Sequence, residues 1–465
     1  MKIRKPSVGP ILGSTTDTVA RLFIGGDLEL SRGQPRRAHG VVRVRLRRRR
    51  VQKFSSPKYF PLSPNFDMTG VGILQNLRAD TEYDYQVGWI YSDVDSKVID
   101  IGEGQLDWGD CVERTFRTAS VSQRRERSFV VGSCRYLLRL FGGSWFDNRG
   151  DKTFRSIVRQ IDQDQRRTDA VLMVGDQIYA DDLNVVNPDR RVDKFFKRYR
   201  EAFSTPGISE LMSRVPTYMT LDDHEIEDNW PARASSQDYM LKFPEAIHAY
   251  QTYQLSHSPL LPIKNGKLSG TPDCLWYSFR DGCADFFVTD TRTERILNKT
   301  QRSIIGEEQE AALFSWLNDR SGRVKVIASA VPLFSATDED KWEGFIEQRD
   351  RLLDFVHDNG IRRVVVVSGD VHASFSAELH SKHRSFKVIS VVSSSFFWPY
   401  PHPARSSFQK NGKLKSNSHN GYAIAKHSNV HTTDSFARVT CSPTRMTVEF
   451  YARKGAKLGA TTHRF

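Results

Sequence analysis

Four short polar clusters, each directly after an apolar stretch, constrain the fold of this chain more than any other feature. They lie at residues 132–135, 175–179, 222–225 and 369–372, and three of them contain a glycine just before the reactive residues. In an α/β sheet, ligands gather at the carboxyl ends of the strands, so clusters far apart in the sequence can meet in one crevice. Glycine there permits sharp turns and close approach of the backbone to a ligand. The pattern predicts an α/β fold with one converged site.

The chain changes its rhythm near residue 122. Before it, short strand-like segments are divided by Gly, Pro and Asp turns, which predicts an all-β sandwich at 1–122. After it, apolar strands alternate with amphipathic helices, which predicts an α/β domain at 123–465. Within that domain we expect strands at 170–174, 217–221, 323–331 and 363–367, helices at 154–161, 307–317 and 345–358, and a long loop or lid at 398–430.

The side chains of the clusters suit metal ions. Asp176 can bridge two cations through its two carboxylate oxygens, and Tyr179, three residues later, can turn back to one of them as a phenolate. The soft thiolate of Cys134 and the imidazole of His372 favour iron as that cation. The sequence therefore predicts a first metal site with these four ligands.

A second cation would share the bridging aspartate and take the hard oxygens of Asp223 and Asp370. We expect Fe³⁺ in the first site and Ca²⁺ in the second, with Mn²⁺, Mg²⁺ or Zn²⁺ as alternatives in one or both. Each residue alone has a more ordinary explanation, such as a core cysteine or a helix N-cap. Four such accidents at four strand ends are improbable together, which favours the metal interpretation.

The clusters resemble the catalytic motifs of the alkaline phosphatase D (PhoD-like) family, a branch of the calcineurin-like metallophosphoesterases. Ser-Cys, Gly-Asp-Gln-Ile-Tyr, Asp-Asp-His-Glu and Gly-Asp-Val-His occur in that family's order, and Asp-Thr-Arg at 290–292 matches a further stretch. Residues 9–17 resemble the start of its fibronectin-like β domain, which would close at 115–118. The resemblance implies a four-layer α/β/β/α sandwich behind a fibronectin-like all-β domain.

The resemblance also implies roles for individual residues. Iron would be held by Cys134, Asp176, Tyr179 and His372, and calcium by Asp176, Asp223 and Asp370. His224 would face the leaving group. In the mechanism that we expect from these residues, His224 would then orient the phosphoryl oxygens or protonate the leaving alkoxide, and Arg292 or Arg135 would clamp the equatorial oxygens as charge builds. The chain departs from the family at Asp228-Asn229-Trp230, where members usually have Asn-Asn before the aromatic residue.

The function so implied is hydrolysis of phosphate monoesters or diesters by a metal-activated hydroxide, which makes the chain a phosphoric ester hydrolase of the alkaline phosphatase or phosphodiesterase type. One alternative is a nuclease- or phospholipase-type diesterase, with nucleic acid or anionic lipid as partner. It is supported by a net charge of +13 and by the arginines of residues 42–50, although charge runs more often solvate a strand. The other alternative, an inactive metal-binding adaptor, is disfavoured by intact Asp176, His224 and His372.

Composition bears on the location of the protein. No window approaches the roughly 18 apolar residues of a membrane span, and the segment after Met1 lacks the apolar stretch of a secretory signal. The five cysteines are scattered, which indicates a reducing compartment rather than a disulfide framework. We therefore predict no transmembrane helix and a cytoplasmic location.

Overall fold

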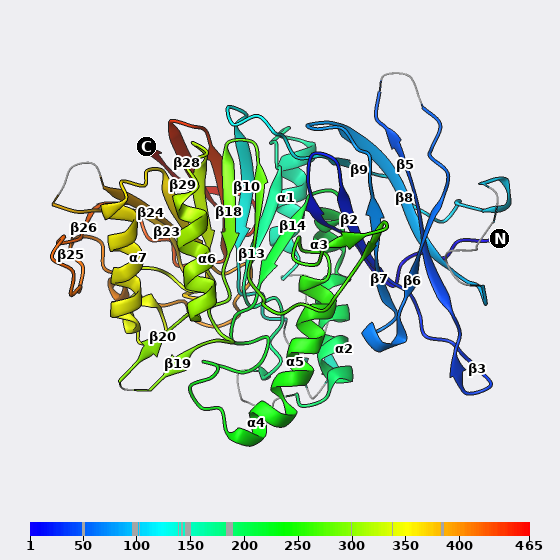
Figure 1. Cartoon of the computed structure of the whole chain (residues 1–465), viewed down its shortest axis with the longest axis horizontal. Helices are drawn as coiled ribbons and strands as arrows, with labels where there is room; N and C mark the ends of the chain where they lie inside the picture. The colour runs from blue at the N-terminus through cyan, green and yellow to red at the C-terminus, as the bar shows by residue number, and fades with distance from the viewer. Residues whose placement is uncertain are drawn as a thin grey trace.

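Two β-sheets stacked face to face form the centre of the molecule, with helices on both outer faces (Figure 1). Helices α6 (Glu307–Asn318) and α7 (Ile346–Asp358) pack on the outer face of the eight-stranded sheet. Helix α1 (Lys152–Asp162) packs against the six-stranded sheet. This arrangement confirms the predicted α/β/β/α fold class. The computed structural model describes residues 1–465 except 49–51, 95–100, 102, 138, 141–142, 145–149, 183–188, 299, 337 and 383–385.

The six-stranded sheet has the order β14-β13-β10-β27-β28-β29. Strands β10, β13 and β14 are parallel neighbours, so their carboxyl ends lie at one edge, whereas β27, β28 and β29 continue the sheet antiparallel. The strand bounds are β10 (Arg127–Gly132), β13 (Ala170–Val174), β14 (Thr217–Thr220), β27 (Ser435–Cys441), β28 (Arg445–Ala452) and β29 (Lys457–Arg464).

The eight-stranded sheet has the order β17-β18-β21-β22-β24-β23-β26-β25. Its centre, from β18 through β24, is parallel, so a second set of carboxyl ends lies at one edge. The strand bounds are β17 (Tyr277–Asp281), β18 (Ala284–Val288), β21 (Val324–Ala328), β22 (Val364–Ser368), β23 (Ser374–His380), β24 (Lys387–Ser393), β25 (Gly412–Lys413) and β26 (Ala423–His427).

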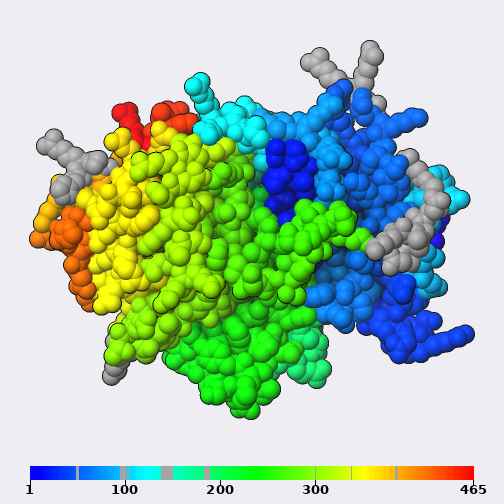
Figure 2. Space-filling model, viewed as in Figure 1, coloured from blue at the N-terminus to red at the C-terminus, as the bar shows by residue number. Residues whose placement is uncertain are grey.

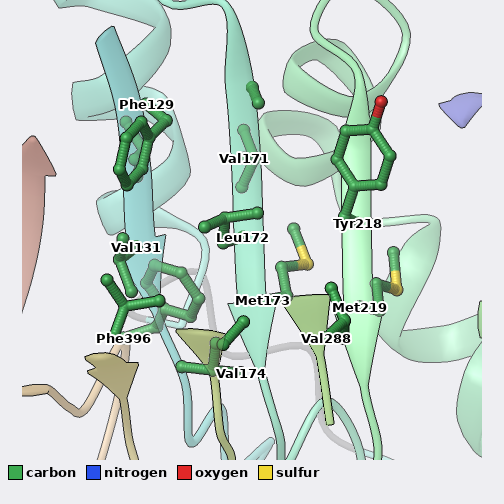
Figure 3. Packing of buried hydrophobic residues seen from close by; sticks show 14 of the residues in the cluster. Phe129, Val131, Val171, Leu172, Met173, Val174, Tyr218, Met219, Val288 and Phe396 are labelled. Carbon is green, nitrogen blue, oxygen red and sulfur yellow. The ribbon is translucent and has the colours of Figure 1, made fainter. Parts of the chain in front are cut away.

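The core between the two sheets is built from continuous apolar runs. Strands buried on both faces do not alternate with polar residues, and β13, with the sequence AVLMV, is buried throughout. Phe129 of β10 meets Phe286 of β18 edge to face, with ring centroids 5.4 Å apart. Figure 3 shows Val131 of β10, Val174 of β13 and Phe396 packed together near the carboxyl ends. This packing fixes the edge on which the polar clusters stand.

The N-terminal residues form two further sheets, and Figure 2 shows these residues, in blue, on one side of the molecule. They enclose a core of their own that includes the fully buried Trp89 and Tyr85. Strand β9 (Arg114–Arg117) is the last strand of these sheets, and β10 (Arg127–Gly132) already belongs to the six-stranded sheet, so a boundary at 122 remains our prediction. The sheets are β1 (Val8–Thr15), β2 (Ala20–Gly25) and β7 (Thr69–Leu74), and β6 (Lys58–Leu62), β5 (Ala38–Leu46), β8 (Glu82–Tyr91) and β9.

The remaining elements connect these layers. The other helices are α2 (Val192–Phe203), α3 (Pro206–Met212), α4 (Ser236–Leu241), α5 (Phe243–Tyr250) and the short helical turns at Pro64–Phe66, Glu103–Gln105, Gln251–Leu255, Trp342–Gly344 and Arg405–Ser407. Two-residue strands pair as β3 (Leu30–Ser31) with β4 (Gln34–Pro35), β11 (Arg139–Leu140) with β12 (Gly143–Ser144), β15 (Ile263–Lys264) with β16 (Lys267–Leu268), and β19 (Ile296–Leu297) with β20 (Arg302–Ser303).

The arginines of strand β5 and of the residue after it have partners within the N-terminal sheets. Arg43 donates to Gln86 at 3.0 Å, and its guanidinium lies over the Trp108 ring. Arg45 donates to Glu113 at 2.7 Å, and Arg47 forms an ion pair with Asp84 at 3.0 Å. These contacts agree with the solvated-strand interpretation of the charge run. Arg49 and Arg50, which belong to the same run, lie outside the described residues.

The predicted strands and helices of the α/β domain all have counterparts within a few residues, but the long loop at 398–430 is only partly a loop. Strand β26 lies in this segment and pairs antiparallel with β23, so the prediction was wrong there. The segment's richness in Pro, Ser, Asn and Lys hid the five-residue strand, which lies between β23 and the two-residue edge strand β25. The strand extends the eight-stranded sheet towards its edge.

All five cysteines are free thiols in the structure. Among the helices of the described ranges, none combines the length and the apolar character that crossing a membrane requires.

Candidate metal centre

Five strand ends bring the sequence clusters to one edge of the two stacked sheets. Cys134 follows β10, Asp176 follows β13, and Asp223 follows β14 in the six-stranded sheet. Asp370 follows β22 and Arg292 follows β18 in the eight-stranded sheet. Because these strands are parallel within each sheet, their ends converge as the sequence predicts.

The backbone is strained where the candidate ligands stand. Cys134, Asp176, Asp370 and His372 have φ values of 55°, 56°, 66° and 50°, in the left-handed region that non-glycine residues rarely adopt. Such conformations cost of order 1–3 kcal/mol each and cluster at functional sites. Gly175 has φ 97°, and a Cβ there would lie 2.4 Å from the Cβ of Asp222. Only glycine therefore lets the β13 turn approach the β14 turn this closely.

A thiol and a phenol meet the carboxylate of Asp176. Cys134 donates from Sγ to Asp176 Oδ2 at 3.2 Å, and Tyr179 donates from its hydroxyl to the same oxygen at 3.5 Å. Burial, reinforced by the Asp176 charge, raises the pKa of the Cys134 thiol well above its usual range. Burial likewise raises the pKa of Tyr179. A cation bound here would have to displace both protons, as metal ligation by thiols requires.

Three buried aspartates and the half-buried Asp370 form the acidic part of the site. Asp176, Asp222, Asp223 and Asp370 each offer a carboxylate oxygen within 4.8 Å of the others. Within the part of the chain that the structure describes, Asp176 Oδ1 and Asp222 Oδ2 are buried without a hydrogen-bond partner. Burial raises the pKa of Asp222 to about 8 and that of Asp176 well above its usual range. Buried oxygens of this kind are costly unless a cation or a donor satisfies them, so this donor set fits metal ions.

His372 stands beside this acidic group. Its ring lies against that of Trp398, with centroids 3.9 Å apart and a tilt of 32°, and its backbone N–H donates to Ser394 Oγ at 3.1 Å. Burial lowers the pKa of His372 to about 3, so the ring is neutral, which is the form that binds metals. Among the described residues, the groups of ligand atoms that lie within 4.8 Å of one another do not include His372 or Cys134.

His224 lies among the carboxylates of the site, so it could bind a metal ion as well as act on the leaving group. A ring nitrogen of His224 forms a possible ligand group with Asp176 and Asp223. Its Nδ1 is 2.9 Å from Asp181 Oδ2, and Asp181 also accepts from the backbone N–H of Asp228 at 2.8 Å. Burial opposes the charged ring, but the surrounding carboxylates outweigh it and raise the pKa of His224 well above its usual range. The Asp181 contact fixes the ring orientation.

Three basic side chains form ion pairs with acidic residues in or beside this site. Arg292 is fully buried, and it donates from Nε to Asp222 Oδ1 at 2.5 Å while Nη2 lies 3.6 Å from Asp223 Oδ1. Lys341 contacts Asp370 Oδ2, and Arg295 shares Asp340 with Arg292. These contacts hold the ligand carboxylates in place. They also leave Arg292 fully buried and paired with carboxylates, so its expected role as a phosphoryl clamp stays a prediction.

Arg135 is not part of the converged group, and the structure argues against the clamp role that the sequence suggested. Its guanidinium donates to the Ala202 carbonyl and to Thr205 Oγ1, and it lies over the ring of Phe154 at 4.9 Å. Only 1% of its surface is exposed. The reason is side-chain direction: the backbone of Arg135 follows Cys134, but its side chain extends towards the helices that flank the sheet.

Sequence reasoning missed several residues of the site. Asp222 and Glu225 belong to the recognised cluster at 222–225 but received no role, although Glu225 accepts from the backbone N–H of Gln177 at 2.7 Å and of Asp222 at 3.0 Å. Asp181 follows the 175–179 cluster by two residues, which is a usable signal. Lys341 and its neighbour Asp340 lie in a charged loop far from any strand end, and nothing in the sequence pattern marks them.

The chain is similar to known phosphatases in both sequence and structure. Alkaline phosphatase D of Bacillus subtilis (strain 168) is 29% identical over 216 residues, a match covering 39% of this chain and 35% of that protein, so this chain matches about a third of the relative's length. A solved structure of PhoD superposes with a TM-score of 0.71 at 18% identity, covering 99% of this chain and 89% of that one.

Purple acid phosphatase PPD1 from seeds of yellow lupin (Lupinus luteus) superposes with a TM-score of 0.60 at 15% identity, covering 99% of this chain and 74% of that one. At these identities, both superpositions show a shared fold. The model of the PhoD-like phosphatase family matches residues 137–450, which is more than half of the chain and includes three of the four polar clusters. The chain therefore belongs to the PhoD-like phosphatase family.

Proposed function

We propose that the chain hydrolyses phosphate esters in a metal-dependent reaction at the converged strand ends. The observation that carries the proposal is the group of three buried aspartates and the half-buried Asp370, in which Asp176 Oδ1 and Asp222 Oδ2 lack a hydrogen-bond partner among the described residues. Burying carboxylate oxygens without a partner is costly, and a bound cation would remove that cost. The family membership supplies the reaction class, because it is a family of phosphatases.

For the ions, the donor set supports Fe³⁺ beside Cys134, Asp176, Tyr179 and His372, and Ca²⁺ beside Asp176, Asp223 and Asp370. Thiolate, phenolate and imidazole suit iron, whereas carboxylates alone suit a hard divalent ion. Asp222 joins the second group as a further candidate ligand. Mn²⁺, Mg²⁺ and Zn²⁺ remain the alternatives in either site. Bound ions of this kind polarise a phosphoryl oxygen and lower the pKa of the attacking water.

The chain's own residues would do the rest. His224, oriented by Asp181, would donate a proton to the leaving alkoxide. Arg292 and Lys341 would hold the carboxylates in register. The hydroxyl of Ser394 lies 3.1 Å from Cys134 Sγ and would steady the thiolate. Positive charge held behind the acids limits their mutual repulsion, so the site keeps its shape before and after a cation enters.

Colour and metal content test the iron assignment. The purified protein is expected to contain iron and to be visibly coloured, since phenolate and thiolate ligands transfer charge to ferric iron. Cys134→Ser is expected to lose most of the iron and the colour, because a hydroxyl is a harder and weaker ligand for this site. Metal analysis and the visible spectrum measure both. The matched control is Cys111→Ser, in the N-terminal core, which should keep both.

The opposite outcome is equally clear. If Cys134→Ser kept its iron and its spectrum, Cys134 would be a core residue and not a ligand. If the unmodified protein hydrolysed phosphate esters at full rate while colourless and free of iron, the iron assignment itself would be wrong.

The two alternative functions receive no support from a specific contact. Among the described arginines of this run, Arg43, Arg45 and Arg47 contact Gln86, Glu113 and Asp84, which reduces the basic surface that a polyanion could meet. The adaptor alternative gives no catalytic role to the buried carboxylate oxygens that lack a partner among the described residues. The cytoplasmic location likewise stays a proposal, supported by the five free thiols.

A further inference from the structure

The structure contains a strip of aromatic rings that runs outward from the candidate metal centre. We propose that Trp398 and Tyr400 form a stacking subsite for a planar aromatic leaving group, such as a nucleobase or an aryl ring, on the phosphate ester. This inference rests on the proposed function, because it names the class of ester that the same site prefers. The following contacts carry it.

The inner end of the strip consists of rings at the metal centre itself. Trp398 lies 3.9 Å from His372 and 6.1 Å from Tyr179, measured between ring centroids. Tyr179 in turn lies 4.2 Å from the ring of His224, the proposed leaving-group acid. A leaving group that departs towards His224 therefore starts beside the edge of this strip.

The outer end of the strip is exposed. Tyr136 contacts Tyr179 edge to face at 5.0 Å, and Tyr400 contacts Trp398 at 5.2 Å, so the rings form one continuous series. The exposed fraction rises from 4% at Tyr179 to 43% at Tyr400, with Trp398 half-buried between them. The rings of Tyr136 and Tyr400 also lie 5.9 Å apart, measured between centroids. Aromatic side chains beside a few convergent polar groups are typical of the lining of small-molecule sites.

The net positive charge of the protein indicates which leaving groups the aromatic strip would accept. The protein has a net charge of +13, and His402, whose Nδ1 faces the carbonyl of His372 at 2.8 Å, forms an ion pair with Asp434 beside the strip. A strongly basic molecule attracts anionic esters and disfavours those with a cationic leaving group. Every nucleobase has a π-face, so stacking on Trp398 and Tyr400 needs no particular base. The strip thus fits a planar, uncharged ring attached to a phosphate.

The test compares two esters with the same leaving alkoxide. Adenosine 5′-monophosphate and ribose 5-phosphate both release a primary sugar alkoxide, and only the first carries a base. The unmodified protein is expected to show a kcat/KM about tenfold or more higher for the nucleotide, expressed mainly in KM because stacking on a remote ring is made before the transition state.

Variants assign that preference to the rings. Tyr400→Ala is expected to lower the ratio of the two kcat/KM values by about five- to tenfold, whereas Tyr400→Phe, which keeps the ring and loses the hydroxyl, should retain it. The matched control is Phe66→Ala, because Phe66 is 45% exposed and stacks on a histidine, His248, in a different part of the molecule. That variant should leave the ratio as it is.

The outcomes separate the two proposals. If the protein released phosphate from neither ester nor from any other phosphate ester, the proposed function would fail. If the kcat/KM values for ribose 5-phosphate and for the nucleotide were equal, the aromatic subsite would be wrong while the hydrolase assignment stood. The same would hold if Tyr400→Ala left the ratio of the two values unchanged. A ratio lost equally in Tyr400→Phe would assign the effect to the hydroxyl and contradict stacking.

Discussion

Asp176→Asn is expected to reduce phosphate release at least about a thousandfold and to empty both metal sites. The reason is that Asp176 is the one carboxylate shared by the thiol and phenol group and by the acidic group. Asparagine keeps the shape but removes the charge, and the cations supply several kcal/mol of transition-state stabilisation. Rates and metal contents of the purified variant give the measurement.

The matched control for this substitution is Asp193→Asn, at an exposed aspartate in the first turn of α2. It should keep both the metals and the rate. An Asp176→Asn protein that retained two cations and a near-normal rate would contradict the bridging role.

His224→Gln is expected to lose about 10²–10⁴ in rate with alkyl phosphates while keeping its metals. The loss should be much smaller with nitrophenyl phosphate, because a nitrophenolate leaves without a proton donor. Asp181→Asn should show a weaker form of the same pattern, since it removes the group that orients the His224 ring. The measurement is a series of esters that differ in the pKa of the leaving alcohol.

A different pattern would reassign His224. It lies in a possible ligand group with Asp176 and Asp223. If the variant lost metal along with rate, and lost rate equally for every ester, His224 would be a metal ligand rather than the acid.

The convergence of the site could be predicted from the sequence because it depends on the backbone alone. Parallel strands place their carboxyl ends at one edge whatever the side chains do, and the apolar runs that end before Asp176 and Asp370 are easily recognised. The same logic located β13, β14 and β22 to within a residue or two. At four candidate ligands the backbone is left-handed, which is a feature that the strand pattern alone does not predict.

What the sequence could not predict depends on the direction of side chains and on long-range contacts. Arg135 follows a strand end as Asp176 does, yet its side chain turns away to Thr205. Lys341 reaches Asp370 from a loop with no apolar pattern. Strand β26 is only five residues long, and the polar segment around it, which has no regular period, gave no sign of its pairing with β23.

The measurement that tests the account most directly is phosphate release by metal-stripped protein, before and after the return of iron and calcium. We expect the stripped protein to be inactive on nitrophenyl phosphate and on an alkyl phosphate. Iron and calcium together should restore the rate, and either ion alone should restore less, because the two donor sets at Asp176 differ in hardness. Undiminished phosphate release by protein shown to be free of metal would contradict the account.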